Sequence, residues 1–475
     1  ADKQIEKYLN RYAEPEAGRV VKLFSDVNPN SGMAATIAYE HCLVIPARDE
    51  NWHEIQQVWR NLTARIVVIL IVNTSDEDDH ETERLLTDAI SSHQLSCGNL
   101  YLSRLSSSID CLIVDRVSKN WIFKQTEGVG LARKIGADIA LSMISSGLVT
   151  NPFINNTDAD AQLPSDYFDA SQQNTASDKK VAAIVRPFRH VLRSDQAPSA
   201  GEETSIKDAP YQAQIQAQTQ AKVRAQVQAQ VRAMLLYEIS LYYYVNRLKH
   251  ANSPYAFHTV GSTITVNAKD YALVRGTPKR LAGEDFYLLN KLAKTGLVLS
   301  ASSAPIELDA RVSHRTPFGT GSSIDRIQCL SNPIEENLYY QPAIFELLKA
   351  LLARLPLIWD ENKVADTFRH DDLLANWGAE TGAFDEIGKQ KHRLKSRQVF
   401  VKFLRDWFDG FRTLKFVHYM RDKHYPSQPI GWICKQDIDL GVSTVSDTSD
   451  LRIILSKLGC PPASVHPEHK ITTRK

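Results

Sequence analysis

The sequence predicts an α/β fold in which a mostly parallel sheet is flanked by helices and followed by a C-terminal helical region. Two observations predict it. Short apolar runs alternate with helical patterns up to about residue 330, which is typical of strand–helix–strand crossovers. Beyond that point the patterns are helical alone. The chain is therefore divided into an N-terminal helical arm (1–38), an α/β domain (39–330) and a C-terminal helical region (331–475).

The first half of the α/β domain supplies four predicted strands. Continuous runs of β-branched and other apolar residues, which are typical of buried parallel strands, occur at 42–46 (CLVIP), 65–72 (RIVVILIV), 109–114 and 153–154. A helical arm is expected at 2–13. A further helix is expected at 128–145, where one stripe carries Leu131, Ile135, Ile139 and Met143. Because ligands of parallel sheets bind beyond the carboxyl ends of the strands, the polar loops after these strands are the expected site.

The second half of the chain contains one unusual stretch. From Tyr211 the sequence is rich in Gln, but its apolar residues follow a four-residue step among good helix formers, which predicts a long amphipathic helix rather than a disordered tract. The triple Tyr at 242–244 is interpreted as packing. Strands are expected at 181–187 and 258–267, exposed or extended loops at 193–210 and 306–320, helices at 283–295, 344–355 and 397–421, and a frayed polar tail at 461–475.

Composition excludes several classes of protein. The 475 residues include 56 Lys and Arg against 55 Asp and Glu, so no global field attracts nucleic acid or an anionic membrane. The six cysteines form no CxxC pair, which excludes a zinc knuckle or a redox motif, and we expect buried thiols in a reducing cytoplasm. No apolar run reaches the roughly 18 to 20 residues of a membrane span, and the N-terminus has no apolar signal core. We expect a cytoplasmic protein.

The strongest chemical feature is the pair Asp158 and Asp160, which follows the apolar run at 153–154. In an extended backbone, residues two apart point the same way, so two carboxylates share a face. Mg²⁺ and Mn²⁺ prefer oxygen ligands and share them with substrate phosphates. Such an ion would stabilise a departing nucleoside diphosphate. The alternative is that this DxD motif is an ordinary solvated loop.

Four motifs in order are more specific than the DxD motif alone. The chain contains VIPARDE at 44–50, GLARK at 130–134, NTDAD at 156–160 and GEDF at 283–286. In this order and spacing they resemble the family 2 glycosyltransferases, which have the GT-A fold, and the stretches FHTVGST (257–263) and RVSHRTPFGTG (311–321) resemble a bacterial subgroup of that class. The resemblance covers about residues 40–325. It implies that 39–330 is a catalytic domain that binds a nucleotide sugar.

The resemblance also implies roles for individual residues. The nucleotide-sugar donor would be bound by four segments. These are the loop after the first strand with Pro46, Ala47, Arg48 and Glu50, and the loop after the second strand with Asp76, or Asn73 in its place. The other two are the 128–145 helix with Arg133 and Lys134, and the DxD motif with Asp158. Asp158 and Asp160 would hold Mn²⁺ or Mg²⁺, with His314 completing the metal site. Arg311 and Arg315 would clamp phosphates. A solvated helix face for Arg133 and Lys134 and a plain surface loop around His314 are the alternatives.

Asp285 is the expected general base, and Glu284 is its substitute. Inverting transfer needs a carboxylate that accepts the proton of the acceptor hydroxyl as the new C–O bond forms. Alternatively, both acids stabilise the N-terminus of their helix. Relatives that retain stereochemistry need no such base, so the stereochemical outcome stays open. The expected reaction is transfer of a single sugar from a UDP- or GDP-sugar to a hydroxyl of a small molecule, a glycan or a lipid-linked acceptor.

Two other functions remain open from the sequence. Nucleotidyl transfer uses similar sheets and paired acids. Such enzymes normally have a Gly-rich phosphate-binding loop near the first strand, however, and the loop at 46–50 is not rich in glycine. A non-catalytic scaffold could use the C-terminal region, with its four tryptophans, as an interface, although a core is the preferred interpretation. The sequence leaves homo-oligomerisation open. It also does not identify the base, the sugar or the acceptor.

Overall fold

A computed structural model describes residues 2–25, 38–169, 180–192, 209–311 and 319–462 of the chain. Within them, a nine-stranded sheet has the order β11-β8-β10-β6-β1-β2-β5-β4-β3. Its strands are β1 His41–Ala47, β2 Ile66–Asn73, β3 Leu95–Cys97, β4 Leu100–Arg104, β5 Ile109–Arg116, β6 Phe153–Asn156, β8 Val181–Val185, β10 Ile264–Asn267 and β11 Leu297–Ser300. A smaller sheet joins β7 Ala161–Gln162, β12 Ile306–Asp309 and β9 Phe188–Val191, and β13 Leu338–Tyr339 pairs with β14 Gln428–Pro429.

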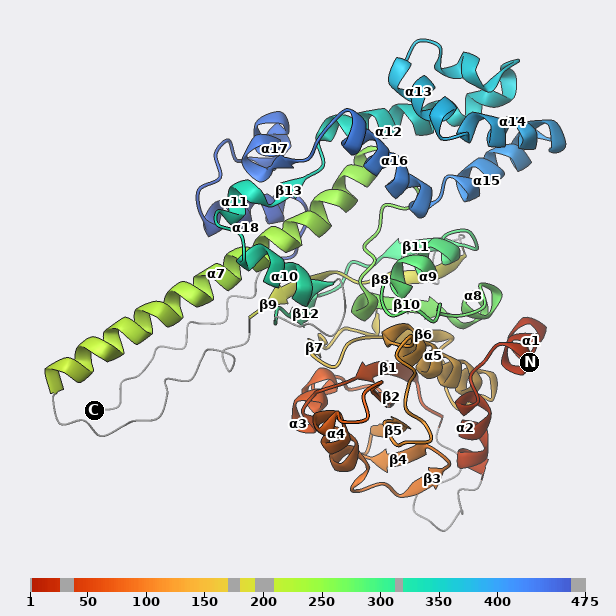
Figure 1. The fold of residues 1–475 in the computed structure, drawn as a ribbon. Coiled ribbons are helices and arrows are strands. Elements are labelled where there is room, and N and C mark those ends of the chain that lie inside the picture. The colour runs from red at the N-terminus through yellow and green to blue at the C-terminus, as the bar shows by residue number, and fades with distance from the viewer. Residues whose placement is uncertain (1, 26–37, 170–179, 193–208, 312–318, 463–475) are drawn as a thin grey trace.

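The helices flank this sheet and continue into the C-terminal region (Figure 1). The first group is α1 Lys3–Arg11, α2 Glu16–Ser25, α3 Trp52–Ile55, α4 His80–Ile90, α5 Val129–Ser145, α7 Ala209–His250, α8 Ala268–Leu273, α9 Glu284–Leu292 and α10 Thr320–Gln328. The C-terminal group is α11 Pro333–Glu336, α12 Pro342–Arg354, α13 Asp372–Glu380, α14 Ala383–Arg393, α15 Arg397–Trp407, α16 Gly410–Lys423, α17 Ile430–Gln436 and α18 Thr448–Lys457. The α/β class with a mostly parallel sheet and a helical C-terminal region is confirmed.

The centre of the sheet is parallel. β1 pairs in parallel with β2 and β6, and β2 pairs in parallel with β5, whereas β10 and β4 run the other way. All of β2 is buried, as its continuous apolar run predicts for a strand covered on both faces. The carboxyl ends of β1, β2 and β6 therefore lie side by side at one edge.

Two apolar cores cover the two faces of the sheet. Alternate residues of β1 and β2 point to opposite faces, so Val44 and Ile71 pack with α1, α2 and α5, whereas Ile45 and Val68 pack with α3, α4, α7 and the C-terminal helices. Helix α5 lies very close to the sheet. A Cβ on Gly136 would come within 2.3 Å of Val44 Cγ1, so only glycine allows this approach.

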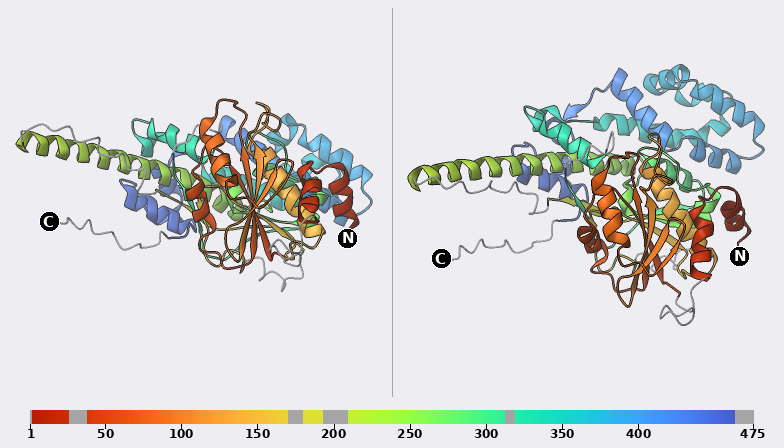
Figure 2. Two further views of the ribbon diagram at one scale, coloured as in Figure 1. Left: turned by 90° about the horizontal axis from the view of Figure 1, so that it is seen from below. Right: turned by 60° about the horizontal axis from the view of Figure 1, so that its bottom comes forward.

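Helix α7 is the longest element of the described chain. Its 42 residues begin just before the Gln-rich tract and run through it, so the predicted helix is confirmed there. Figures 1 and 2 show that the N-terminal part of α7 projects away from the sheet, while its C-terminal part runs between the sheet and the C-terminal helices. Trp377 and Trp407 are buried, and Trp359 and Trp432 pack against the same core, as the core interpretation predicts. The division into three domains stays a prediction.

Several local expectations were wrong or incomplete. The hairpin of β3 and β4 was missed, and the region 258–267 is a strand only from Ile264 onward. The helix expected at 397–421 is interrupted, because Asp409 accepts hydrogen bonds from the backbone of Phe411 and Arg412 and so starts α16. Four cysteines are buried as expected, but Cys329 is exposed and Cys97 is half-buried. Among the described residues, no helix has the length and apolar character of a membrane span.

Candidate functional site

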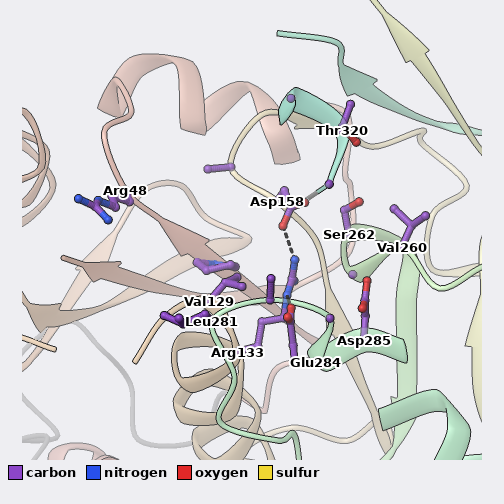
Figure 3. A pocket seen from close by; sticks show the side chains of 18 of the residues that line it. Arg48, Val129, Arg133, Asp158, Val260, Ser262, Leu281, Glu284, Asp285 and Thr320 are labelled. Carbon is purple, nitrogen blue, oxygen red and sulfur yellow. Dashed lines mark hydrogen bonds and ion pairs between the residues drawn. The ribbon is translucent and has the colours of Figure 1, made fainter. Parts of the chain in front are cut away.

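A cavity of about 750 Å³ lies at the carboxyl ends of the central strands. Its wall combines the loops after β1, β2, β5 and β6 with parts of α5, α7, α9, β12 and α10. Figure 3 shows that side chains from segments far apart in the sequence converge on it. The position is the one that a parallel sheet offers to a ligand.

Arg133 connects two of the predicted motifs. It lies near the start of α5 and is buried; its Nη2 is 2.5 Å from Asp158 Oδ1, and its Nε donates to Glu284 Oε1 at 2.9 Å. Figure 3 shows the Arg133 side chain between these two acids. A Cβ on Gly261 would come within 2.7 Å of Arg133 Nη2, so the glycine makes room for the guanidinium. Asp158 and Glu284, 126 residues apart in the sequence, are thus joined by one cation.

Arg311 makes the corresponding connection on the other side of the cavity. It donates two hydrogen bonds to the Glu50 carboxylate, one of them 3.0 Å between Nη1 and Oε2, and its Nη2 lies 3.3 Å from Asp160 Oδ2. Such bidentate pairs fix the plane of the guanidinium. The loop after β1 and the DxD motif are therefore held together through Arg311.

Asp285 has a different electrostatic environment. It lies in the first turn of α9, after Gly283, whose φ of 74° is a conformation that favours glycine. Removal from water and then repulsion from Glu284 raise the pKa of Asp285 to about 7, against the opposing effects of the Phe286 N–H and Arg133. Figure 3 shows the Asp285 side chain on the side of Val260 and Ser262, away from the ion pair of Arg133 with Asp158. A carboxyl with a pKa near neutrality suits general base catalysis.

The described wall of the cavity carries more acids than bases. Seven acidic side chains (Glu50, Glu127, Asp158, Asp160, Glu284, Asp285 and Asp309) face three arginines (Arg48, Arg133 and Arg311). A diphosphate alone would be repelled by this excess, whereas a divalent cation would be attracted. The carboxylates of Asp158 and Asp160 supply the hard oxygen donors that Mg²⁺ and Mn²⁺ prefer, so the residues fit such an ion.

No group of three His, Cys, Asp or Glu side chains in the described ranges is arranged to enclose a metal ion. This arrangement is compatible with Mg²⁺-type sites, in which one or two protein carboxylates act together with substrate phosphates and water.

Most of the predicted site residues line the cavity. These are Pro46, Ala47, Arg48, Glu50, Asn73, Arg133, Asp158, Asp160, Glu284, Asp285 and Arg311. His314 and Arg315 lie outside the described residues, so their expected roles stay predictions. Asp76 is exposed and is absent from the wall, where Asn73 and Ser75 represent the loop after β2. Asn73 rather than Asp76 therefore lines the cavity, and within the described residues the buried Asn73 Oδ1 has no hydrogen-bond partner.

Lys134 does not reach the cavity. Its ammonium lies 2.6 Å from Asp138 Oδ2 and donates to Tyr8 and to the carbonyl of Tyr12, on the side of α5 that faces α1. Consecutive helical residues point about 100° apart, and here Arg133 faces the cavity while Lys134 faces α1. The expectation that Lys134 belongs to the nucleotide site is not supported, because its ammonium is engaged away from the cavity.

The cavity wall also contains a chain of polar residues that the sequence does not predict. Thr320 Oγ1 lies 3.2 Å from His190 Nε2, and His190 Nδ1 lies 3.2 Å from Glu238 Oε1. His190 and Glu238 are buried, whereas Thr320 lines the cavity together with Tyr237. His190, Glu238 and Thr320 come from β9, α7 and α10, and only Thr320 lies in a stretch that carries the resemblance, 311–321. Only tertiary structure could bring them together.

Comparisons with known proteins give little further information. No protein-family model matches the chain, and no curated protein matches it. Among solved structures, the chain is similar to the mannosyltransferase PcManGT from Pyrobaculum calidifontis in complex with GDP-Man and Mn²⁺. The sequence identity is 13%, the TM-score is 0.29, and the match covers 89% of this chain and 96% of that one. A likeness of this size does not establish a shared family or activity.

Proposed function

We propose that the protein is a metal-dependent glycosyltransferase of the family 2 type, which transfers one sugar from a nucleoside diphosphate donor to an acceptor hydroxyl with inversion. One observation carries the proposal: Asp158, Asp160 and Asp285 line the same cavity at the carboxyl ends of the strands. The first two fit a cation that accompanies a diphosphate, and the third has the pKa of a base that works near neutral pH.

The residues would divide the work as follows. The loops after β1 and β2 would bind the nucleoside, with the unpartnered Asn73 Oδ1 accepting a hydrogen bond from it. Arg133 would orient Asp158 and Glu284 through its two ion pairs, and Arg311 would orient Glu50 and Asp160. A bound Mn²⁺ or Mg²⁺ supplies charge neutralisation of the diphosphate leaving group.

Asp285 would act on the acceptor. As the acceptor oxygen forms its bond to the anomeric carbon, Asp285 accepts the hydroxyl proton, and the bond from that carbon to the nucleoside diphosphate breaks with its electron pair on the phosphate oxygen. The partial burial of Asp285 lowers competition from water for this proton. Its neighbour Glu284 is engaged by Arg133, which makes Asp285 the better base.

Thermal shift against UDP, GDP, CDP and dTDP, with and without Mn²⁺, tests the proposal. A ligand that binds only the folded chain raises its stability by mass action. We expect one nucleotide to raise the melting temperature more strongly with Mn²⁺ than without it. Asp160→Ala should weaken the Mn²⁺-dependent binding about 10-fold or more, whereas Asp78→Ala, at an exposed acid outside the cavity wall, should leave it unchanged.

Two results would contradict the proposal. The first is the absence of any nucleotide effect in the presence of Mn²⁺. The second is release of inorganic pyrophosphate from a nucleoside triphosphate and a sugar phosphate, which would indicate nucleotidyl transfer instead.

A further inference from the structure

A second cavity, of about 250 Å³, adjoins the large one. The two share four wall residues: Leu241, Thr259, Val260 and Phe286. Phe286 follows Asp285 directly in the chain, so the small cavity begins beside the proposed base. A molecule that fills it could place a terminal hydroxyl near Asp285.

The wall of the small cavity is apolar. Helix α7 contributes Leu241, Val245 and Leu248, which share one helical face, and α16 contributes Leu414. Rings of Tyr244, Tyr255, Phe257, Phe286 and Tyr340 add further apolar surface, and Ser240, His258, Thr259, Asn290 and Thr413 are the polar residues of the wall.

Several polar groups of this wall are turned toward protein partners, whereas the buried Thr413 Oγ1 has no hydrogen-bond partner within the described residues. Tyr255 donates to the carbonyl of Arg405, Ser240 donates to that of Leu236, and the Tyr340 hydroxyl lies 2.9 Å from His418 Nε2. The Asn290 amide is engaged on both sides, by Asp409 and by the Gly410 N–H. Burial lowers the pKa of His258 to about 4, so its ring is neutral near pH 7. The cavity therefore presents mainly carbon and uncharged surface to a ligand.

We infer that this cavity is an acceptor subsite for an apolar group, specifically the aryl or short alkyl portion of an alcohol whose hydroxyl reaches Asp285. The size supports this occupant, because an apolar protein cavity of about 150 Å³ already accommodates benzene. The occupant is apolar because the described wall offers it no charged side chain. The inference rests on the proposed function, and it assigns a role to α16 of the C-terminal region, namely to close the acceptor side of the site.

The test uses the full chain and 3-phenylpropan-1-ol, which has an apolar ring and a terminal hydroxyl, with propane-1,3-diol as the polar comparison. We expect saturable binding of the aryl alcohol, measured by titration calorimetry or ligand-observed NMR, and no saturable binding of the diol. Leu414→Trp should weaken aryl alcohol binding at least tenfold by filling the cavity, and the smaller Leu414→Phe should have an intermediate effect. Lys415→Trp is the matched control, because Lys415 is exposed on the same helix and does not line the cavity.

The outcomes separate this inference from the proposed function. If the wild-type chain does not bind the aryl alcohol saturably, or if both Leu414 variants bind it as the wild type does, the subsite is wrong. Nucleotide binding with Mn²⁺ is measured on the same preparations, and its retention in Leu414→Trp shows that the variant is folded. If no preparation binds a nucleotide while the aryl alcohol still binds and responds to Leu414→Trp, the proposed function fails but the apolar site stands.

Discussion

At the scale of single residues, positively charged arginines alternate with carboxylates in the site. Each of two arginines, Arg133 and Arg311, lies between two carboxylates that come from different elements. An isolated buried charge would be strongly unfavourable. Each arginine and its carboxylate partners therefore offset the free-energy cost of burying one another. Within the described residues, Asp285 forms no ion pair of this kind with either arginine, and its pKa is raised instead.

The raised pKa of Asp285 predicts the pH dependence of the reaction. The base must be deprotonated to accept a proton, so kcat/KM should rise with pH up to about 7 and then level off. Glu284→Gln keeps an oxygen for Arg133 but removes the charge that helps raise the pKa of Asp285, so it should shift the rise to lower pH. The measurement is kcat/KM against pH for both forms. An unchanged midpoint in the variant would contradict the assignment of Asp285.

At the scale of elements, α5 connects the site to the N-terminal helices. One side of the helix presents Arg133 to the cavity, and the other presents Lys134 and Asp138 to α1 and α8. Asp138 is fully buried and accepts hydrogen bonds from Lys134, Tyr8, Tyr271 and the backbone N–H of Glu14. This network fixes the N-terminal arm to the helix that positions Arg133.

Asp138→Asn should therefore destabilise the protein. The substitution leaves the buried Lys134 ammonium without its nearest counter-charge, since Glu14 is 3.7 Å away, and breaking a buried pair in this way costs about 3 kcal/mol or more. Urea denaturation measures the change in the free energy of unfolding. The comparison is Asp88→Asn, which removes an exposed pair with Arg84 and should cost less than about 1 kcal/mol. Equal effects of the two substitutions would show that the Asp138 network is not a structural anchor.

At the scale of the whole molecule, the C-terminal helices share a core with the sheet. Leu348 and Leu351 of α12, Trp377 of α13 and Phe416 of α16 belong to the same apolar cluster as Ile45 of β1 and Ile239 of α7. The C-terminal region also contributes to the small cavity beside the site. The helical region is thus packed as part of the folded body in the described chain.

Truncation after residue 330 tests this interpretation. Removal of residues 331–475 would expose the apolar face of α7, and we expect the truncated chain to be insoluble or to lack a cooperative unfolding transition. Soluble expression followed by thermal unfolding measures the outcome. A truncated chain that is soluble and unfolds at the temperature of the full chain would show instead that the C-terminal region is an independent unit.

The sequence by itself determined the local features of this protein. Continuous apolar runs predicted β1, β2, β5 and β6, and the four-residue step predicted α7 through a Gln-rich tract, because strand burial and helical periodicity are local patterns. The residues after those strands also proved to line one cavity, since parallel strands end at a common edge.

Only the tertiary structure decided which charges meet. The directions of Arg133 and Lys134 depend on how α5 is rotated against the sheet, and the contacts of His190 with Glu238 and Thr320 join three elements that are distant in the sequence. The apolar cavity between α7, α9 and α16 likewise arises from packing of the C-terminal region against helices from the middle of the chain. Such contacts follow from long-range packing, which local periodicity does not encode.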